Sequence, residues 1–278
     1  MQFPTLLLAA LFGTAALAAP SGAMGHGLAA RLATRTQRQS QPLSRVGSAA
    51  GPVSVSGSNG NGNATSHVEY SSNWAGAVYE EPPSGTFTAV SATVTVPVPT
   101  ATAAGTYSAS AWVGIDGDTC GSAILQTGVD FTATKSGSKT SYSYDAWYEW
   151  YPDYAYDFSS FSVSAGDVIV MSVVSSSSTS GTATLDNLTT GKTVSKTLSS
   201  SSALCGENAE WIVEDFESNG ELVAFADFGT VLFTGASAKT TTETVGTSDA
   251  TLIDIKQGNS VLTSASIPSS SEVEVTYE

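Results

Sequence analysis

The stretch SVSAGDVIVMSVVSS, residues 162–176, is the clearest guide to the fold of this chain. Its segment Ala165-Gly166-Asp167 is a turn signal, and apolar residues occupy alternate positions after it. Because successive side chains of a β-strand point to opposite faces, alternation with a period of two indicates a strand buried on one face. The stretch therefore predicts a turn that leads into an antiparallel strand.

The same pattern of short alternating runs and turn residues recurs from residue 70 to the end of the chain. Examples are TFTAVSATVTVPVP (86–99), SYSYDAWYEWY (141–151) and GTATLDNLTTGKTVSKTL (181–198). No stretch of useful length has the periodicity of an amphipathic helix. We therefore predict an all-β fold, an antiparallel two-sheet β-sandwich of jelly-roll type. Residues 67–278 are numerous enough to bury one core, so we expect one domain.

Ionisable residues divide the chain into two parts. Residues 1–66 hold all four Arg and no Asp or Glu, whereas all 25 acidic residues lie from Glu69 onward, with six Lys. Such an acidic surface repels nucleic acid and anionic membranes, so neither is an expected partner. Near a pH of about 4 much of the charge would be neutralised, which suits an acidic environment. Solubility alone is the alternative explanation.

The first 66 residues read as targeting and processing segments. Residues 1–18 contain the apolar run TLLLAALFGTAALA and end in Ala16-Leu17-Ala18, which predicts a secretory signal and an extracellular protein. Residues 19–66 are basic and rich in Ala, Ser and Gly, which is typical of a pro-segment and linker. We hypothesise that this segment binds the acidic domain and leaves when the carboxylates protonate. A solvated tail is the alternative.

The Cys and His content excludes several kinds of catalytic site. Cys120 and Cys205 are the only cysteines, and an isolated pair in an oxidising compartment most often forms one bridge. The only histidines are His26 and His67, so the domain lacks the base of a Ser-His-Asp or Cys-His site and the ligands of a typical zinc site. No metal and no other cofactor is implied.

The remaining candidates for catalysis are carboxyl groups. Glu210 in NAEWIVEDFE and Glu149 in YDAWYEWYPDYAYDF lie within strand-like aromatic runs. Partial burial there would raise the pKa of a carboxyl group and suit it for acid–base catalysis. The alternative is that both are solvent-facing strand residues.

Five segments resemble the glutamic peptidases, or eqolisins, of filamentous fungi, in order over residues 70–278. They are SSNWAGAVY, AWVGIDGDTCGSAILQTGVDF, SYDAWYEWYPDYAYDF, NAEWIVEDFE and LVAFADFGTVLF. The resemblance implies a β-sandwich and a secreted, acid-active endopeptidase that acts on polypeptides. It also implies insensitivity to pepstatin and a basic pro-segment that acts as an inhibitor.

The resemblance assigns the catalytic pair to Gln126 in ILQTG and Glu210 in AEWIVEDFE. Glu210 is expected to act as general base toward a water molecule and then to protonate the leaving amine. Gln126 is expected to position that water and to donate its amide to the developing oxyanion. A carboxylate works best as a base near its own pKa, so this pair is consistent with activity in acid.

The resemblance also implies a substrate cleft near this pair. Trp112, Asp116 and Asp130 fall in the same block as Gln126 and are expected to line the cleft, although Trp112 could equally be a core residue. The aromatic stretch around Glu149 is expected to form a strand and loop whose rings wall the cleft. A Cys120–Cys205 disulfide would tie the Gln126 block to the Glu210 block.

Other interpretations of the residues stay open. A jelly-roll glycoside hydrolase would pair Glu210 with Glu149 and make Gln126 dispensable, and a lectin-like module would stack sugars on the aromatic residues. Asn63 and Asn187 begin N-glycosylation sequons. We expect a monomer.

Overall fold

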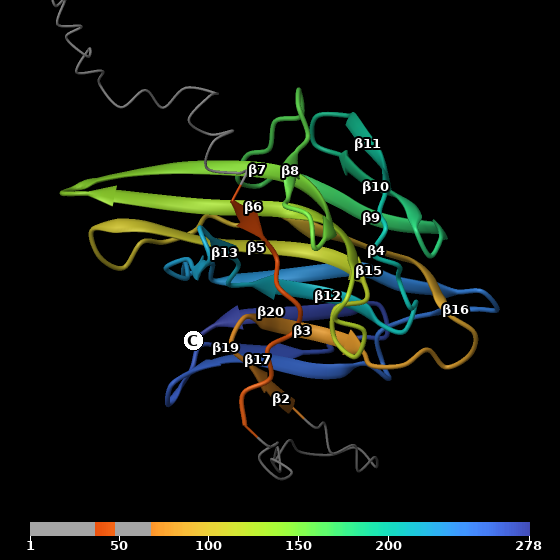
Figure 1. Cartoon of the computed structure of the whole chain (residues 1–278). Coiled ribbons are helices and arrows are strands. Elements are labelled where there is room, and N and C mark those ends of the chain that lie inside the picture. Colours follow the sequence, from red (N-terminus) through yellow and green to blue (C-terminus); the bar gives the residue numbers. More distant parts are fainter. Residues whose placement is uncertain (1–36, 48–67) are drawn as a thin grey trace, which may run out of the picture.

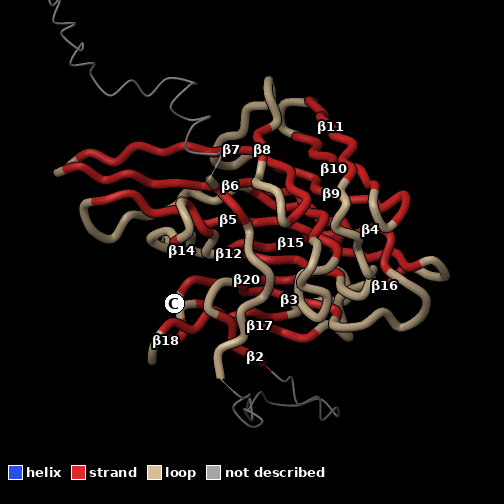
Figure 2. The backbone as a smooth tube through the Cα atoms, in the orientation of Figure 1, coloured by secondary structure: helices blue, strands red, loops and turns tan. Residues whose placement is uncertain are grey.

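The computed structural model describes residues 37–47 and 68–278, and in this part of the chain it is built from strands without a helix (Figures 1 and 2). Two large sheets stack face to face, and almost all neighbouring strands are antiparallel; β2 and β17 form a parallel pair. The predicted all-β, two-sheet sandwich is therefore confirmed. The predicted signal peptide lies outside the described residues. No helix in the described part of the chain is long and apolar enough to cross a membrane.

The nine-stranded sheet carries the features that matter for function. Its strands are β2 (Val68–Ser71), β3 (Trp74–Tyr79), β5 (Gly105–Ile115), β6 (Ile124–Ser136), β7 (Lys139–Tyr151), β8 (Tyr156–Asp157), β12 (Ala209–Glu214), β17 (Thr251–Gln257) and β18 (Ser260–Val261). At its centre the strand order is β3-β12-β5-β6-β7.

The eight-stranded sheet covers one face of the first. Its strands are β4 (Phe87–Thr95), β9 (Val168–Ser177), β10 (Ser180–Asn187), β11 (Lys192–Ser199), β15 (Thr230–Thr240), β16 (Thr244–Val245), β19 (Thr263–Ser266) and β20 (Glu272–Tyr277). A small third sheet joins β1 (Arg38–Gln39), β13 (Glu217–Ser218) and β14 (Glu221–Leu222).

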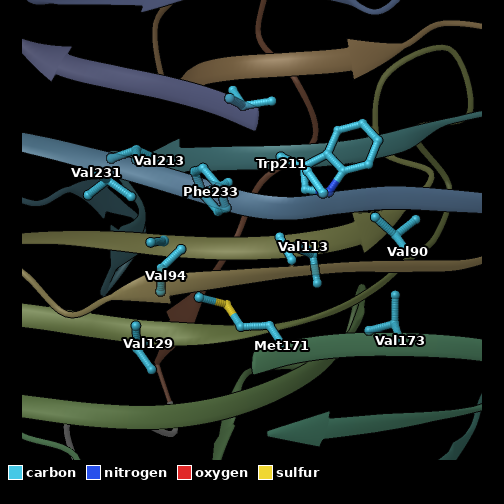
Figure 3. Packing of buried hydrophobic residues seen from close by; sticks show 14 of the residues in the cluster. Val90, Val94, Val113, Val129, Met171, Val173, Trp211, Val213, Val231 and Phe233 are labelled. Carbon is cyan, nitrogen blue, oxygen red and sulfur yellow. The ribbon is translucent and has the colours of Figure 1, made fainter. Parts of the chain in front are cut away.

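The hydrophobic core fills the space between the two large sheets, as Figure 3 shows for Met171, Phe233 and Trp211. Strand β10 illustrates why this sequence makes a strand, since its residues alternate between buried and partly buried along its whole length. The alternation predicted for residues 168–174 is also present, with Ile169, Met171 and Val173 buried in the core. Sandwich packing of this kind buries one face of each strand.

The central strands of the nine-stranded sheet are buried on both faces, and β12 is buried at every position. A second apolar cluster lies on the face away from the core. Its buried members are Trp74, Val78, Trp112, Ile124, Trp147, Ala155, Ile212 and Ile253. We call this the outer face. Because the opposite face of this sheet already packs on the core, the outer face can be buried only if another part of the chain covers it.

Part of that cover is the segment Gln37–Gly47, which we call the strap. In Figure 1 it is the orange-red trace that crosses the sheet from β7 and β8 toward β2. Its first end pairs with β13, and Leu43 packs against the outer-face cluster. Its far end forms a bridge from Arg45 to Ser71. This part of the predicted pro-segment is therefore docked on the domain and is not a solvated tail.

Two neighbouring valines on β9 provide a test of the core assignment. The side chain of Val173 is fully buried, whereas Val174 is 49% exposed. Replacing Val173 with Ala should lower the free energy of unfolding by about 2 kcal/mol, because two buried methyl groups and their packing are lost. Val174→Ala should change it by less than about 0.5 kcal/mol. Urea unfolding measures both, and equal effects would contradict the predicted orientation of the strand.

Candidate active site

The register of four strands places the two predicted catalytic residues in one row on the outer face. Glu210 on β12 is paired with Gly114 on β5, which is paired with Gln126 on β6, which is paired with Glu149 on β7. Paired residues on adjacent strands point to the same face. Glu210 and Gln126 are therefore separated by one strand, and the residue between them has no side chain.

Gly114 keeps the space between the two side chains open. A Cβ atom at this position would lie 3.3 Å from Gln126 Cβ, 3.3 Å from Glu210 Oε2 and 2.7 Å from Cζ3 of the Trp112 ring. Adjacent strands are about 4.8 Å apart, so the backbones of Glu210 and Gln126 lie roughly 10 Å apart. Two long side chains that lean over a glycine at this separation can act on a single small group held between them.

The polar atoms of this pair are buried but uncommitted. Both oxygens of Glu210 and both the nitrogen and oxygen of the Gln126 amide lack a hydrogen-bond partner among the described residues, and both residues are 0% exposed. Buried polar groups in folded proteins are nearly always hydrogen-bonded, because an unsatisfied one costs about 1–3 kcal/mol. Four such atoms in one place indicate a site built for a ligand or a reacting group.

Burial also changes the acidity of Glu210. Loss of solvent raises the pKa of its carboxyl group well above the ordinary value, and the nearby negative charges of Asp116 and Asp118 raise it further. A carboxyl group with a raised pKa can exchange a proton with a bound reactant in mildly acidic solution.

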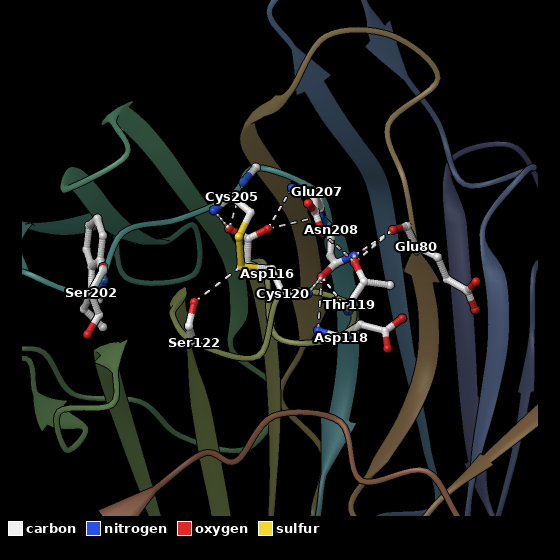
Figure 4. Close-up of a disulfide and its surroundings, with 12 residues drawn as sticks. Glu80, Asp116, Asp118, Thr119, Cys120, Ser122, Ser202, Cys205, Glu207 and Asn208 are labelled. Carbon is white, nitrogen blue, oxygen red and sulfur yellow. Dashed lines mark hydrogen bonds between the residues drawn. A yellow bond between two sulfur atoms is a disulfide. The ribbon is translucent and has the colours of Figure 1, made fainter.

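Asp116 supports the position of Glu210. Its carboxylate accepts hydrogen bonds from the backbone N–H groups of four consecutive residues, 205–208, at 2.8 to 3.2 Å (Figure 4). These residues lead directly into β12 and hence to Glu210. Both oxygens of Asp116 thus hold the backbone of this loop, and contact of Asp116 with a substrate stays a prediction.

The expected disulfide between Cys120 and Cys205 is present and braces the same loop (Figure 4). It joins the segment before β6 to the segment before β12, so it ties the Gln126 block to the Glu210 block as predicted. Among the described residues, the one group close enough to hold a metal ion consists of Asp116 and these two cysteines, whose sulfur atoms are already bonded to each other.

A second feature of the outer face is a pocket that holds the guanidinium of Arg38. The guanidinium bonds Asp130 through Nε at 3.3 Å and one terminal nitrogen at 3.1 Å, and Glu149 through the other at 3.0 Å. Further hydrogen bonds go to the hydroxyls of Ser110 and Ser40. The side chain of Arg38 is only 3% exposed. Asp130 and Glu149 thus lie on the outer face, and both contact the strap.

Aromatic and acidic side chains complete this pocket. The Arg38 guanidinium lies 3.9 Å from the ring centre of Trp147 and 4.5 Å from that of Phe216. Trp112, which is fully buried on the outer face, donates its indole N–H to Glu214 Oε2 at 3.0 Å. Burial raises the pKa of Glu214 to about 7, although Arg38 opposes this effect.

Sequence reasoning did not single out Ser110, Gly114, Phe216 or Glu214. Two of these could have been found from the period of two. Glu214 follows Glu210 by four residues on β12, and Ser110 precedes Gly114 by four on β5, so each pair shares a face. Trp147, which belongs to the aromatic stretch around Glu149 that was expected to wall the cleft, precedes Glu149 by two on β7. The role of Arg38 had no local signal, because it depends on where the strap docks.

The structure describes only one of the two asparagines that begin sequons. Asn63 lies outside the described residues. Asn187 is fully buried at the end of β10, and its amide nitrogen donates to Asp167 Oδ2 at 2.8 Å. A glycan on that nitrogen would displace this hydrogen bond and the surrounding chain, so the folded domain disfavours a glycan at Asn187.

The fold and the site together define a class: a β-sandwich protein with a buried carboxyl–amide pair on the outer face of one sheet. A family model described as the Peptidase A4 family matches residues 72–277. The chain is 48% identical to aspergillopepsin-2 of Aspergillus niger over the full length of both chains. It is 47% identical to scytalidopepsin B of Scytalidium lignicola over 70% of this chain and 74% of that protein. The chain belongs to the Peptidase A4 family.

Solved structures agree with this assignment. Scytalido-glutamic peptidase in complex with a peptide-based transition state analog is 45% identical, with a TM-score of 0.65, over 74% of this chain and 98% of that one. Aspergilloglutamic peptidase from Aspergillus niger is 60% identical, with a TM-score of 0.57, over 62% of this chain and 99% of that one. The resemblance to glutamic peptidases inferred from the five segments is thereby confirmed.

The alternative of a glycoside hydrolase is not supported. Glu210 and Glu149 stand at the two ends of the row, three strand spacings or roughly 14 Å apart at the backbone. Catalytic carboxyl groups of glycosidases lie about 5–10 Å apart. Glu149 is also committed to Arg38 and to the backbone N–H of Ser40.

Buried acids should make the domain more stable in acid. Burial raises the pKa of Asp215 to about 7 and of Asp254 to about 6, above the ordinary value near 4. The folded state therefore binds more protons than the unfolded state between about pH 4 and 7, so the free energy of unfolding should fall as pH rises through this window. Each carboxyl contributes about 1.4 kcal/mol per unit of pKa shift.

Urea unfolding at a series of pH values measures this slope. Asp215→Asn should flatten the slope, because the variant has no proton to lose at that position. Asp186→Asn, a change on β10 in the other sheet, serves as the control and should retain the slope of the wild type. A stability that rises from pH 4 to 7 would contradict the assignment.

Proposed function

We propose that this chain is a secreted acid endopeptidase in which Glu210 is the general base and acid and Gln126 is the oxyanion donor. The observation that carries the proposal is the row in which the uncommitted polar atoms of these two residues flank Gly114. Membership of the Peptidase A4 family and the similarity to a peptidase solved with a peptide-based transition state analog support the same reaction.

In the proposed mechanism, the ionised Glu210 takes a proton from a water molecule while the water oxygen attacks the carbonyl carbon of the scissile peptide bond. The Gln126 amide N–H donates to the oxyanion that forms, and an amide keeps this proton at any pH. Glu210 then delivers its proton to the amide nitrogen as the C–N bond breaks, which returns the carboxylate.

The neighbouring residues divide into two roles. We assign three residues of the outer face to substrate binding. They are Glu149 in the catalytic row, and Trp112 and Asp130 beside this row. Asp116 instead positions the loop that leads to Glu210. Gly114 leaves the space that a peptide carbonyl and a water molecule would occupy.

The strap is proposed to inhibit the enzyme by occupying the substrate-binding face. The backbone N–H of Ser40 donates to Glu149 in the catalytic row, and that of Gln41 donates to Glu214. At the far end of the strap, Arg45 forms ion pairs with Glu69, Glu80 and Asp118. A polypeptide substrate could not cross the outer face while the strap remains there.

Secretion and a monomeric state belong to the same proposal. The apolar run that ends at Ala18 supports export, and export is consistent with a disulfide. The catalytic row is complete within one chain, so the reaction needs no second copy. We also propose residues 19–66 as the pro-segment and 67–278 as the peptidase domain.

Removal of either catalytic group should abolish or strongly reduce peptide hydrolysis. Glu210→Gln should leave no measurable cleavage, because the amide cannot accept a proton from water. Gln126→Ala should lower kcat by about 100- to 1,000-fold through loss of an oxyanion donor. The assay is cleavage of an unfolded protein at about pH 4 with pepstatin present. Glu274→Gln on β20 in the other sheet is the matched control and should cleave like the wild type. Wild-type activity in Glu210→Gln, with its fold intact, would overturn the mechanism.

Binding of the strap should weaken as pH falls. The carboxylates that face the two strap cations are Asp130, Glu149 and Glu214 around Arg38, and Glu69, Glu80 and Asp118 around Arg45. In sufficiently acidic solution the buried guanidinium of Arg38 loses its counter-charges, which costs several kcal/mol.

A labelled peptide of residues 37–47 tests this effect by fluorescence anisotropy, with the separated domain, residues 67–278, as its binding partner. We expect the Kd to rise at least about tenfold from pH 6 to pH 3, since loss of a buried counter-charge costs more than 1.4 kcal/mol. A peptide with Arg38→Gln should bind weakly and with little pH dependence. Binding that is equal or tighter at pH 3 would refute acid release.

A further inference from the structure

Two loops that lead to the catalytic pair hold each other through two buried side chains. The first loop, residues 116–123, connects β5 to β6, the strand that carries Gln126. The second loop, residues 200–208, leads into β12, the strand that carries Glu210. The Asp116 carboxylate of the first loop accepts the backbone N–H groups of residues 205–208 in the second. The side chain of Asn208 makes the converse contact.

The amide oxygen of Asn208 accepts the backbone N–H groups of Asp118, Thr119 and Cys120 at 3.0 to 3.2 Å (Figure 4). Its backbone carbonyl accepts the N–H of Asp116, and its backbone N–H donates to the Asp116 carboxylate, both at 3.2 Å. Each loop therefore supplies acceptors for the backbone N–H groups of the other. We call this arrangement of Asp116 and Asn208 the reciprocal lock.

The amide nitrogen of Asn208 extends the reciprocal lock to β3. It donates to the backbone carbonyl of Glu80 at 2.9 Å and to the hydroxyl of Thr119 at 2.8 Å. Glu80 directly follows β3, and β12 lies between β3 and β5 in the sheet. The side chain thus binds the ends of both strands that pair with β12, at the point where β12 begins. A shift of β12 along its neighbours would break these bonds.

All the hydrogen-bonding groups of the Asn208 side chain are used. An amide has one oxygen that accepts and one nitrogen that donates twice, and both atoms have their partners. The residue is 0% exposed, and a fully satisfied buried polar network holds its members in one geometry. The polar atoms of Gln126 and Glu210, by contrast, lack partners among the described residues. Asn208 is therefore committed to the structure, and the catalytic pair is left for the reaction.

We infer that Asn208 is a positioning residue for peptide hydrolysis, which acts with Asp116 to hold Glu210 and Gln126 at one separation. The inference rests on the proposed peptidase function. Asn208 lies two residues before Glu210, so it acts through the backbone of β12. A misplacement of about 1 Å can cost about 100-fold in rate, so a looser start of β12 should slow the chemical step. The residues assigned to substrate binding lie on β5, β6 and β7, so binding should be retained.

Steady-state kinetics of Asn208→Ala test this inference. The enzyme is the full-length chain, incubated in acid until its activity is constant, and the substrate is a quenched fluorogenic peptide at about pH 4. We expect kcat to fall about 10- to 100-fold, because Glu210 and Gln126 no longer keep one separation. We expect KM to change by less than about twofold, the pattern of an interaction that acts only in the transition state.

A matched control separates positioning from stability. Asn187 is also fully buried, and its amide nitrogen donates to Asp167, but it lies on β10 in the other sheet. Asn187→Ala should lower the free energy of unfolding in urea and yet retain the kcat of the wild type. Circular dichroism at the assay pH verifies that each variant is folded.

Two further variants make the test independent of one substitution. Asn208→Asp keeps the oxygen that accepts three N–H groups and loses donated bonds, so its kcat should lie between those of the wild type and Asn208→Ala. It carries the test if the alanine variant does not fold. In the double variant Asp116→Asn/Asn208→Ala, the loss in kcat should be smaller than the product of the two single losses, because both residues serve one lock.

The outcomes separate this inference from the proposed function. If the folded Asn208 variants keep the kcat of the wild type, or if Asn187→Ala loses as much, the positioning role is refuted and the peptidase function stands. If the losses of the double variant multiply, Asp116 and Asn208 act separately and the reciprocal lock is wrong. If the wild-type chain cleaves no peptide, the proposed function itself fails.

Discussion

The backbone register across β12, β5, β6 and β7 is the constraint on which the rest of the site depends. Each ladder of hydrogen bonds determines which residues stand side by side, and a slip of one residue would turn every side chain to the opposite face. With the observed register, Glu210, Gly114 and Gln126 share one row on the outer face. The disulfide and the Asp116 carboxylate secure the loop before β12, so they protect this register at the end where β12 begins.

Burial of acidic groups on the outer face raises their pKa values, and it also makes an acidic environment favourable for the domain. Glu210, Glu149 and Glu214 are all shielded from solvent, and burial raises the pKa of each. An environment in which such groups are mostly neutral removes the cost of holding them together. The stability expected in acid and the raised pKa of Glu210 thus have one physical origin, the burial of carboxyl groups.

The strap occupies the face of the sheet to which we assign substrate binding. The strap lies in an extended conformation between β13 and the loop that contains Ala155, and its cations meet carboxylates of the domain. The strap therefore shows how one extended peptide lies on the outer face of the sheet.

Local pattern was enough to predict the strands, the single disulfide and the division into a basic segment and an acidic domain. Periodicity and charge are properties of neighbouring residues, so the chain carries them without its fold; the identities of Gln126 and Glu210 came from resemblance to a family. Three features needed the tertiary structure: the gap at Gly114, the commitment of Asp116 to backbone amides, and the pocket around Arg38. Each depends on which distant strands pair and in which register, and that choice is made by burial of complementary faces across the whole sandwich.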